Sequence, residues 1–141
     1  MTKKLLVIHG PNINLLGSRE PDIYGDLTLD ALNTQITEKA TALGFDVTII
    51  QSNNETEIIE SLHQHRDHNI VINPAAFMHT SIAIRDALAA VEGHKVEVHI
   101  SNVHARESFR HTSYTAGVCD GQISGLGEQS YLLAIDYLSR L

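Results

Sequence analysis

The stretch LLVIH, residues 5–9, is the first element of the pattern that decides the fold. This short apolar run predicts a buried strand. Four further runs have the length and composition of strands. They are FDVTII at 45–50, NIVIN at 69–73, KVEVHI at 95–100 and a short strand within 116–124. The run at 45–50 alternates and is rich in β-branched residues, and the run at 69–73 is ended by Pro74.

Amphipathic stretches lie between these runs and predict helices. Residues 27–44 carry apolar side chains at helical spacing and end at Gly44. The sequence SNNE at 52–55 resembles a capping box and predicts the start of the next helix. Two more helices are predicted at about 80–91 and about 128–140.

Strands that alternate with helices imply a parallel sheet with right-handed crossovers. Five strands fit a flavodoxin-like, doubly wound α/β fold with helices on both faces, and 141 residues predict one domain, 1–141. Such folds bind ligands beyond the carboxyl ends of the strands. Two segments at that end, about 10–27 and 101–115, are longer than ordinary connections, so we expect a lid at 10–27 and a binding segment at 101–115.

Composition excludes several kinds of protein. A net charge of -7 argues against a nucleic-acid partner, which needs a basic stripe. No apolar run approaches the roughly 18 residues that span a bilayer, and the apolar run after Lys3 and Lys4 is too short for a signal peptide. The single Cys119 fits a reducing compartment. These features predict a cytoplasmic protein without a membrane partner.

Common cofactor and catalytic motifs are missing. The segment after the first strand, GPNINLLGS, matches neither a dinucleotide nor an NTP loop, and there is no esterase elbow. GQISGLG at 121–127 is more typical of a turn than of a phosphate cradle. The nine histidines form no compact ligand set in the sequence, so we expect no metal and no cofactor.

Polar residues at the predicted strand ends are the candidates for chemistry. In KVEVHI the alternation puts Lys95, Glu97 and His99 on one face, where Glu97 can orient the His99 ring. Taken alone, a satisfied buried histidine remains the favoured interpretation. Asparagines serve turns more often than ligands, but four of them follow strands, which favours recognition of hydroxyl or carbonyl groups: Asn12, Asn14, Asn73 and Asn102.

The loop sequence REPDIYG, residues 19–25, has neither helical nor strand periodicity. It places Arg19 five residues before Tyr24. A tyrosine ionises near pH 10, so making it a base near pH 7 requires about 4 kcal/mol. A cation about 4 Å away supplies about that much at an effective dielectric near 20. Spacing alone still favours a surface tyrosine on a proline turn.

Four blocks together resemble one family, the type II 3-dehydroquinate dehydratases. They are HGPNINLLGSREPDIYGDLTL at 9–29, QSNNE at 51–55, INPAAFMHTSIAIRDAL at 72–88 and VEVHISNVHARESFRHTS at 96–113. The resemblance covers essentially the whole chain. It implies a flavodoxin-like subunit of a dodecamer built from trimers. It also implies a cofactor-free, metal-free anti-elimination of water from 3-dehydroquinate to 3-dehydroshikimate, in the shikimate pathway.

The resemblance also implies roles, position by position. Tyr24 would be the base, Arg19 its activator and Asn12 the stabiliser of an enolate. His99 would be the acid, oriented by Glu97. Substrate would be held by the remaining residues: Asn73, His79 and Arg110 at hydroxyls, the backbone of Ile100 and Ser101 at the carboxylate, and Asp86 reaching across from a neighbouring subunit. Arg106 would anchor the loop.

The chain departs from the family pattern at three positions, Ile13, Phe77 and Met78, none of which is a proposed acid or base. No lysine is placed for the imine chemistry of the unrelated type of the same enzyme. Two other classes of protein remain open from the residues: a flavodoxin-like module that binds a small polyhydroxy acid without converting it, and, with less support, a flavin carrier. The flavin carrier is disfavoured because the chain has no tryptophan.

Overall fold

A computed structural model describes residues 3–141 and contains one five-stranded sheet. The strands are β1 (Lys3–His9), β2 (Phe45–Gln51), β3 (Asn69–Asn73), β4 (Lys95–His99) and β5 (Gly121–Ser124). All neighbouring pairs are parallel, in the order β2-β1-β3-β4-β5, as a flavodoxin-like fold requires. The predicted strands and their parallel arrangement are therefore confirmed.

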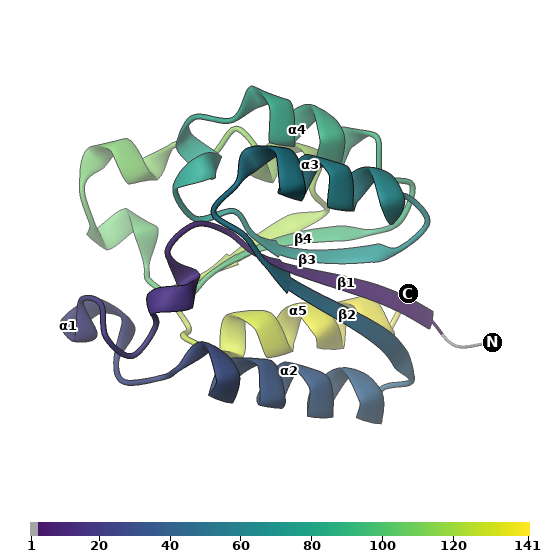
Figure 1. The fold of residues 1–141 in the computed structure, drawn as a ribbon, viewed down its shortest axis with the longest axis horizontal. Coiled ribbons are helices and arrows are strands. Elements are labelled where there is room, and N and C mark those ends of the chain that lie inside the picture. Colours follow the sequence, from purple (N-terminus) through teal and green to yellow (C-terminus); the bar gives the residue numbers. More distant parts are fainter. Residues whose placement is uncertain (1–2) are drawn as a thin grey trace.

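Helices cover both faces of the sheet (Figure 1). The helices α2 (Leu29–Ala42) and α5 (Gln129–Ser139) lie on one face, and α3 (Glu55–Gln64) and α4 (Ile82–Ala89) lie on the other. A one-turn helix, α1 (Pro21–Tyr24), lies outside these layers at the end of the sheet where the strands end. Short 3-10 turns make up the rest: Ile13–Leu15, Ala75–His79, Val103–Ala105, Ser108–His111 and Ala116–Val118.

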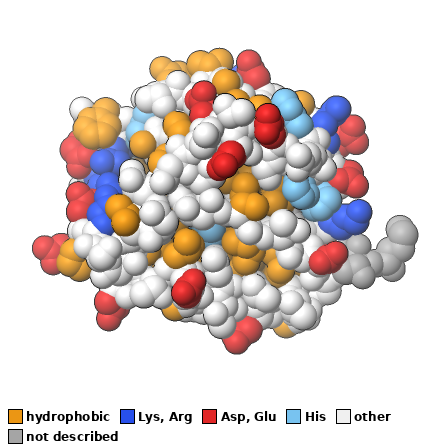
Figure 2. Space-filling view, in the orientation of Figure 1, with side chains coloured by type: hydrophobic (Ala, Val, Ile, Leu, Met, Phe, Trp, Pro, Cys, Tyr) orange, Lys and Arg blue, Asp and Glu red, His pale blue; other side chains and the backbone are white. Residues whose placement is uncertain are grey.

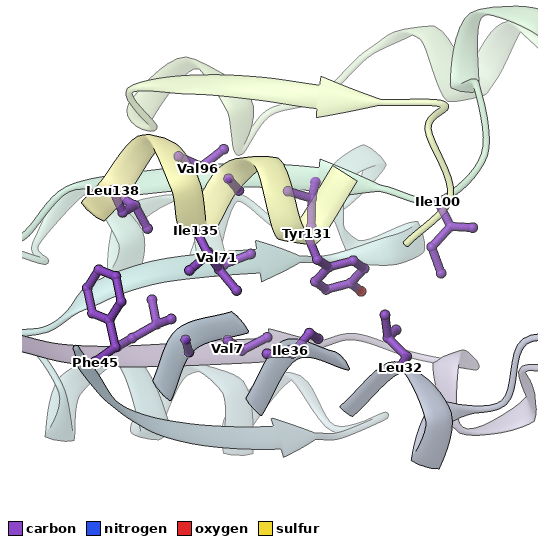
Figure 3. Packing of buried hydrophobic residues seen from close by; sticks show 14 of the residues in the cluster. Val7, Leu32, Ile36, Phe45, Val71, Val96, Ile100, Tyr131, Ile135 and Leu138 are labelled. Atoms are coloured by element: carbon purple, nitrogen blue, oxygen red, sulfur yellow. The ribbon is translucent and has the colours of Figure 1, made fainter. Parts of the chain in front are cut away.

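Alternation within the strands divides the core into two layers. In β1, Leu5 and Val7 pack toward α2 and α5, while Leu6 and Ile8 pack toward α3 and α4. Because both faces of a doubly wound sheet are covered, every one of these side chains is buried. Figure 3 shows the first layer, in which Tyr131 extends from α5 to the same apolar region as Val71 and Ile36.

Two local predictions need correction. The helix α3 is capped by Asn54, whose side chain accepts hydrogen bonds from the backbone of Thr56 and Glu57, and not by Ser52. Ser52 instead bonds to the Glu57 carboxylate. The segment REPDIYG is not aperiodic, since Pro21 begins the one-turn helix α1 that ends at Tyr24.

Lys95 lies at the start of β4, far from the ligand end. Its buried ammonium group donates hydrogen bonds to the carbonyl of Leu88 (2.9 Å), in the last turn of α4, and to that of Val91 (3.1 Å), just after the helix. A helix leaves its last carbonyls without partners, and a cation there also interacts favourably with the helix dipole. Lys95 therefore has a structural role.

Along the described chain, 3–141, no helix is both long and apolar enough to cross a bilayer.

Candidate active site

A cavity of about 260 Å³ opens at the carboxyl ends of β1, β3 and β4. The chain leaves β1 toward one face of the sheet and β3 toward the other, so the cavity lies at the switch point in strand order, where the fold predicts a ligand. Figure 1 shows α1 and the segment around 103–111 at this end, and Figure 2 shows basic side chains flanked by acidic ones there. The two long segments thus border one cavity.

Most of the predicted site residues meet in this cavity. The predicted base, Tyr24, and the predicted acid, His99, both line it although they belong to α1 and β4. The other predicted residues that line it are Asn12, Arg19, Asn73, His79, Ile100, Ser101 and Arg110. Glu97 lies behind His99, and Asp86 is elsewhere on the surface of α4.

The Tyr24 hydroxyl is held by an arginine that comes 82 residues later in the chain. Arg106 Nη1 donates a hydrogen bond of 2.8 Å to Tyr24 Oη and a second of 3.2 Å to Ser101 Oγ. The Arg106 side chain is only 8% exposed, so its charge acts on the phenol with little screening by water. The resemblance to the family implied only the role of a loop anchor for Arg106.

Arg19 contacts the same tyrosine in a different way. Its guanidinium carbon is 5.3 Å from the centre of the Tyr24 ring, and that of Arg106 is 5.4 Å from it. Glu20 lies between the two cations, 3.7 Å from Arg19 Nη2 and 3.5 Å from Arg106 Nη2. Arg19 and Tyr24 therefore do meet, through the ring face, while the hydrogen bond to the hydroxyl comes from Arg106.

His99 is fixed by a buried carboxylate. Its Nε2 donates a hydrogen bond of 3.0 Å to Glu97 Oε2, and both side chains are buried. Glu97 in turn accepts hydrogen bonds from three further side chains: Ser113, Thr115 and Gln122. Gln122 could have been found from the sequence as a polar residue in a strand next to Glu97, but Ser113 and Thr115 carry no such signal.

The surroundings of Glu97 keep it ionised. Burial alone would raise the pKa of this carboxyl group. The hydrogen bond and the charge of His99, together with hydrogen bonds from Thr115 and Gln122, outweigh that effect and hold the Glu97 pKa below its usual value. Nε2 of His99 is thereby committed to the carboxylate, so Nδ1 is the ring nitrogen that remains for a ligand.

The four asparagines at the strand ends divide into two pairs. Asn12 and Asn73 line the cavity. Asn14 instead interacts with Gln51, and Asn102 caps a 3-10 turn by accepting a hydrogen bond of 3.1 Å from the backbone of His104. The prediction of a polar cluster therefore holds for two positions, and the other two serve the turns that asparagine commonly serves.

The His79 ring is part of the cavity lining. Nδ1 donates a hydrogen bond of 2.8 Å to the Thr112 carbonyl, and Nε2 is buried without a hydrogen-bond partner among the described residues. In the neutral ring Nε2 is therefore an acceptor. Arg110 reaches the cavity while its Nε donates to Glu107 at 2.6 Å. Within residues 3–141 no three His, Cys, Asp or Glu side chains are grouped as metal ligands.

Fold and cavity together define the class of this protein, a flavodoxin-like α/β enzyme. A family model described as dehydroquinase class II matches residues 3–139. The chain belongs to this family and is accordingly a hydro-lyase.

Individual relatives agree with this assignment over nearly the full length. The chain is 54% identical over 138 residues to a 3-dehydroquinate dehydratase of Thermotoga neapolitana, covering 98% of this chain and 95% of that protein. A crystal structure of type II dehydroquinase from Propionibacterium acnes is 44% identical, with a TM-score of 0.96 over 100% of this chain and 99% of that one. The type II dehydroquinase of Butyrivibrio crossotus is 48% identical, with a TM-score of 0.94 over 97% of both chains.

Proposed function

We propose that the protein removes water from 3-dehydroquinate to give 3-dehydroshikimate, by an anti-elimination through an enolate and without a cofactor. One observation carries the mechanism: a tyrosine held by a buried arginine and a histidine held by a buried glutamate line one cavity from separate segments. An elimination across opposite faces of a ring needs a base and an acid that are placed independently. The relatives named as 3-dehydroquinate dehydratases supply the substrate of this proposal.

Tyr24 is the proposed base, which removes the proton next to the ketone. Tyrosinate is stabilised by the Arg106 hydrogen bond of 2.8 Å and by the charge of Arg19 over the ring. Hydrogen bonds from a charged donor are about twice as strong as neutral ones. The activation first assigned to Arg19 is therefore shared in this proposal, with Arg106 acting on the oxygen that takes the proton.

Asn12 is the proposed stabiliser of the enolate, acting through a water molecule. It lines the cavity, and its backbone has a φ of 70°, in the left-handed region that asparagine tolerates better than most residues. Its amide group makes no hydrogen bond to another described residue, whereas its backbone N–H donates to Asn53 at 3.0 Å. A fixed backbone with an uncommitted amide suits a group that interacts only with the reacting substrate.

His99 is the proposed acid, which gives a proton to the departing hydroxyl. The ionised Glu97 orients the ring through Nε2, so Nδ1 is the nitrogen that delivers the proton. Substrate hydroxyls would be bound by Asn73, His79 and Arg110. The backbone of Ile100 and Ser101, at the end of β4, would hold the carboxylate.

Asp86 has a separate place in the proposal. It is exposed on α4, where it accepts a hydrogen bond of 2.7 Å from Arg85, and does not line the cavity of its own chain. This position fits the prediction that it approaches the site of a neighbouring subunit in a dodecamer of trimers. Light scattering of the purified protein tests the assembly, and loss of activity in Asp86→Ala tests the contact. A single domain with a lid at 10–27 and a cytoplasmic location also remain predictions.

The reaction is tested by adding 3-dehydroquinate and following the ultraviolet absorbance of the enone product. We expect absorbance to rise without added metal or nucleotide, and neither EDTA nor prior treatment of the protein with borohydride should inhibit it. Tyr24→Phe should abolish the rise while calorimetry still detects binding; the exposed Tyr114→Phe is the matched control and should leave the rate unchanged. Binding without conversion by the unmodified protein would instead support a binding module.

The contributions of Arg106 and Arg19 to the rate can be distinguished by replacing each with methionine. Arg106→Met removes a charged hydrogen bond worth about 1.5–3 kcal/mol, which corresponds to a fall in kcat of about 10- to 160-fold. Arg19→Met removes a charge that lies over the ring but makes no hydrogen bond to the hydroxyl, so it should lower kcat less. A larger loss for Arg19→Met would return the activating role to Arg19.

A further inference from the structure

A chain of buried hydrogen bonds runs from α2 to the cavity wall and is not used by the mechanism above. Tyr131 on α5 and His9 at the end of β1 form its centre, and both side chains are fully buried. His9 Nδ1 lies 2.9 Å from Tyr131 Oη, and His9 Nε2 lies 2.8 Å from Asn33 Oδ1. On the cavity side, Asn73 Nδ2 lies 3.0 Å from Tyr131 Oη. The chain thus ends on a residue that lines the cavity.

The direction of each hydrogen bond follows from a backbone group at the cavity end. The N–H of Ala75 lies 3.0 Å from the Asn73 amide and can only donate, so the atom that it meets must be the oxygen. The Asn73 nitrogen therefore donates to Tyr131 Oη, and the Tyr131 proton goes to His9 Nδ1. A neutral His9 then carries its proton on Nε2, which donates to Asn33. Every atom in the chain has one consistent role.

The same chain of hydrogen bonds supports the strained backbone of Ala75. Ala75 has a φ of 51°, a conformation that costs a residue with a β-carbon about 1–2 kcal/mol. Its N–H is bonded to Asn73, whose other end is bonded to Tyr131. Both Asn73 and Ala75 line the cavity, so the buried chain holds two neighbouring parts of its wall in place.

We infer that His9 and Tyr131 are positioning residues, which act through Asn73 to hold its amide with one N–H turned to the cavity as a donor for an oxygen of the substrate. One N–H of the amide is taken by Tyr131, and the second has no partner among the described residues. That Asn73 binds the substrate rests on the proposed function. The hydrogen-bond chain and its direction rest on the geometry alone.

The protonation states of the two central groups agree with this direction. Burial lowers the pKa of His9 to about 4, against a smaller upward effect of the Asn33 hydrogen bond, so the ring is neutral near pH 7. Burial likewise raises the pKa of Tyr131, so its hydroxyl keeps the proton that it donates. A protonated His9 would present N–H at Nδ1 and leave the Tyr131 proton without an acceptor.

The direction can be measured without any substrate. Nitrogen-15 spectra of histidine-labelled protein distinguish the two neutral tautomers, and a spectrum of His9→Asn identifies the His9 signals among those of the nine histidines. We expect His9 to carry its proton on Nε2 at pH 7. A proton on Nδ1, or a charged ring, would overturn the inferred chain.

The positioning role is measured as affinity for 3-dehydroquinate, by calorimetry in a Tyr24→Phe background that cannot turn it over. Tyr131→Phe removes the hydroxyl and keeps the ring, and we expect the dissociation constant to rise about fivefold, the value of one neutral hydrogen bond. His9→Leu should have the same effect. Asn has the shape of Leu but provides an acceptor for the Tyr131 proton. The dissociation constant of His9→Asn should therefore stay within about twofold of that of the parent.

A merely structural role predicts a different pattern. The affinity losses would then follow the loss of stability in urea, and His9→Asn would resemble His9→Leu. Equal affinity in Tyr131→Phe and its parent would overturn the positioning role directly. If the unmodified protein binds 3-dehydroquinate without converting it, the proposed reaction fails while the affinity comparison still stands. If it does not bind, the proposed substrate fails and the tautomer measurement still tests the chain.

Discussion

The buried His9 makes a quantitative prediction about stability at mildly acidic pH. The unfolded chain binds a proton at this histidine near its ordinary pKa of 6.5, whereas the folded protein resists protonation until about pH 4. Between these values the unfolded state binds more protons, so the free energy of unfolding falls as the pH falls. Replacing His9 by Asn removes this titration and should make the protein less sensitive to acid.

The size of the effect follows from the two pKa values. A shift from 6.5 to about 4 gives a loss of about 2 kcal/mol between about pH 7.5 and about pH 5. Glu97, whose pKa is lowered from 4.5, contributes its loss mainly below that interval. Tyr131, which contacts His9, stays neutral because burial raises its pKa. The other histidines are common to both proteins and cancel in the comparison.

The assay is urea unfolding of both proteins across this pH interval at one protein concentration, because the stability of an assembly depends on concentration. We expect the difference in unfolding free energy between unmodified protein and His9→Asn to change by about 2 kcal/mol, with the unmodified protein losing more as the pH falls. Any loss of stability from the substitution that does not depend on pH is the same at both ends of the interval and cancels from this change. Parallel curves for the two proteins would refute a His9 that is neutral because it is buried.

Three other substitutions test the framework of the site. In Gly10→Ala the new β-carbon would lie 2.6 Å from the Pro74 carbonyl oxygen, so urea unfolding should show a loss of about 1–3 kcal/mol and the enone assay a lower kcat. Lys95→Met leaves the carbonyls of Leu88 and Val91 without this donor and should lower the unfolding free energy by about 2 kcal/mol. Thr115→Val removes a donor to Glu97 and raises its pKa, so the acidic limb of the kcat–pH profile should move to higher pH.

Controls for these variants come from positions with similar chemistry and no such contacts. A β-carbon at Gly117 would have no atom within 4 Å, so Gly117→Ala should keep both stability and rate. Lys4 is exposed and 4.0 Å from Asp67, so Lys4→Met should change stability by less than about 1 kcal/mol. Equal losses in a variant and its control would contradict the assigned contact. An acidic limb unmoved in Thr115→Val would contradict the role given to the bonds around Glu97.

Much of the site could be predicted because the carboxyl ends of parallel strands meet at one edge of the sheet. Asn73 and His99 end two strands, so the sequence predicts both at the ligand end of the sheet, where the structure has them line one cavity with Tyr24. The resemblance then gave roles to these residues. It also gave Arg106 the role of an anchor, although Arg106 is the residue that donates to the Tyr24 hydroxyl. Loop residues have no periodicity from which their contacts can be inferred.

The sequence by itself determined the order of strands and helices along the chain and the burial of both faces of the sheet. Both follow from hydrophobic periodicities of 2.0 and 3.6 residues, which are local properties of the chain. Only the tertiary structure decided which side chains meet across long separations. The bond from Arg106 to Tyr24 spans 82 residues and that between Tyr131 and His9 spans 122. Such pairs depend on how crossovers and loops return to one edge of the sheet, and no short-range pattern encodes that geometry.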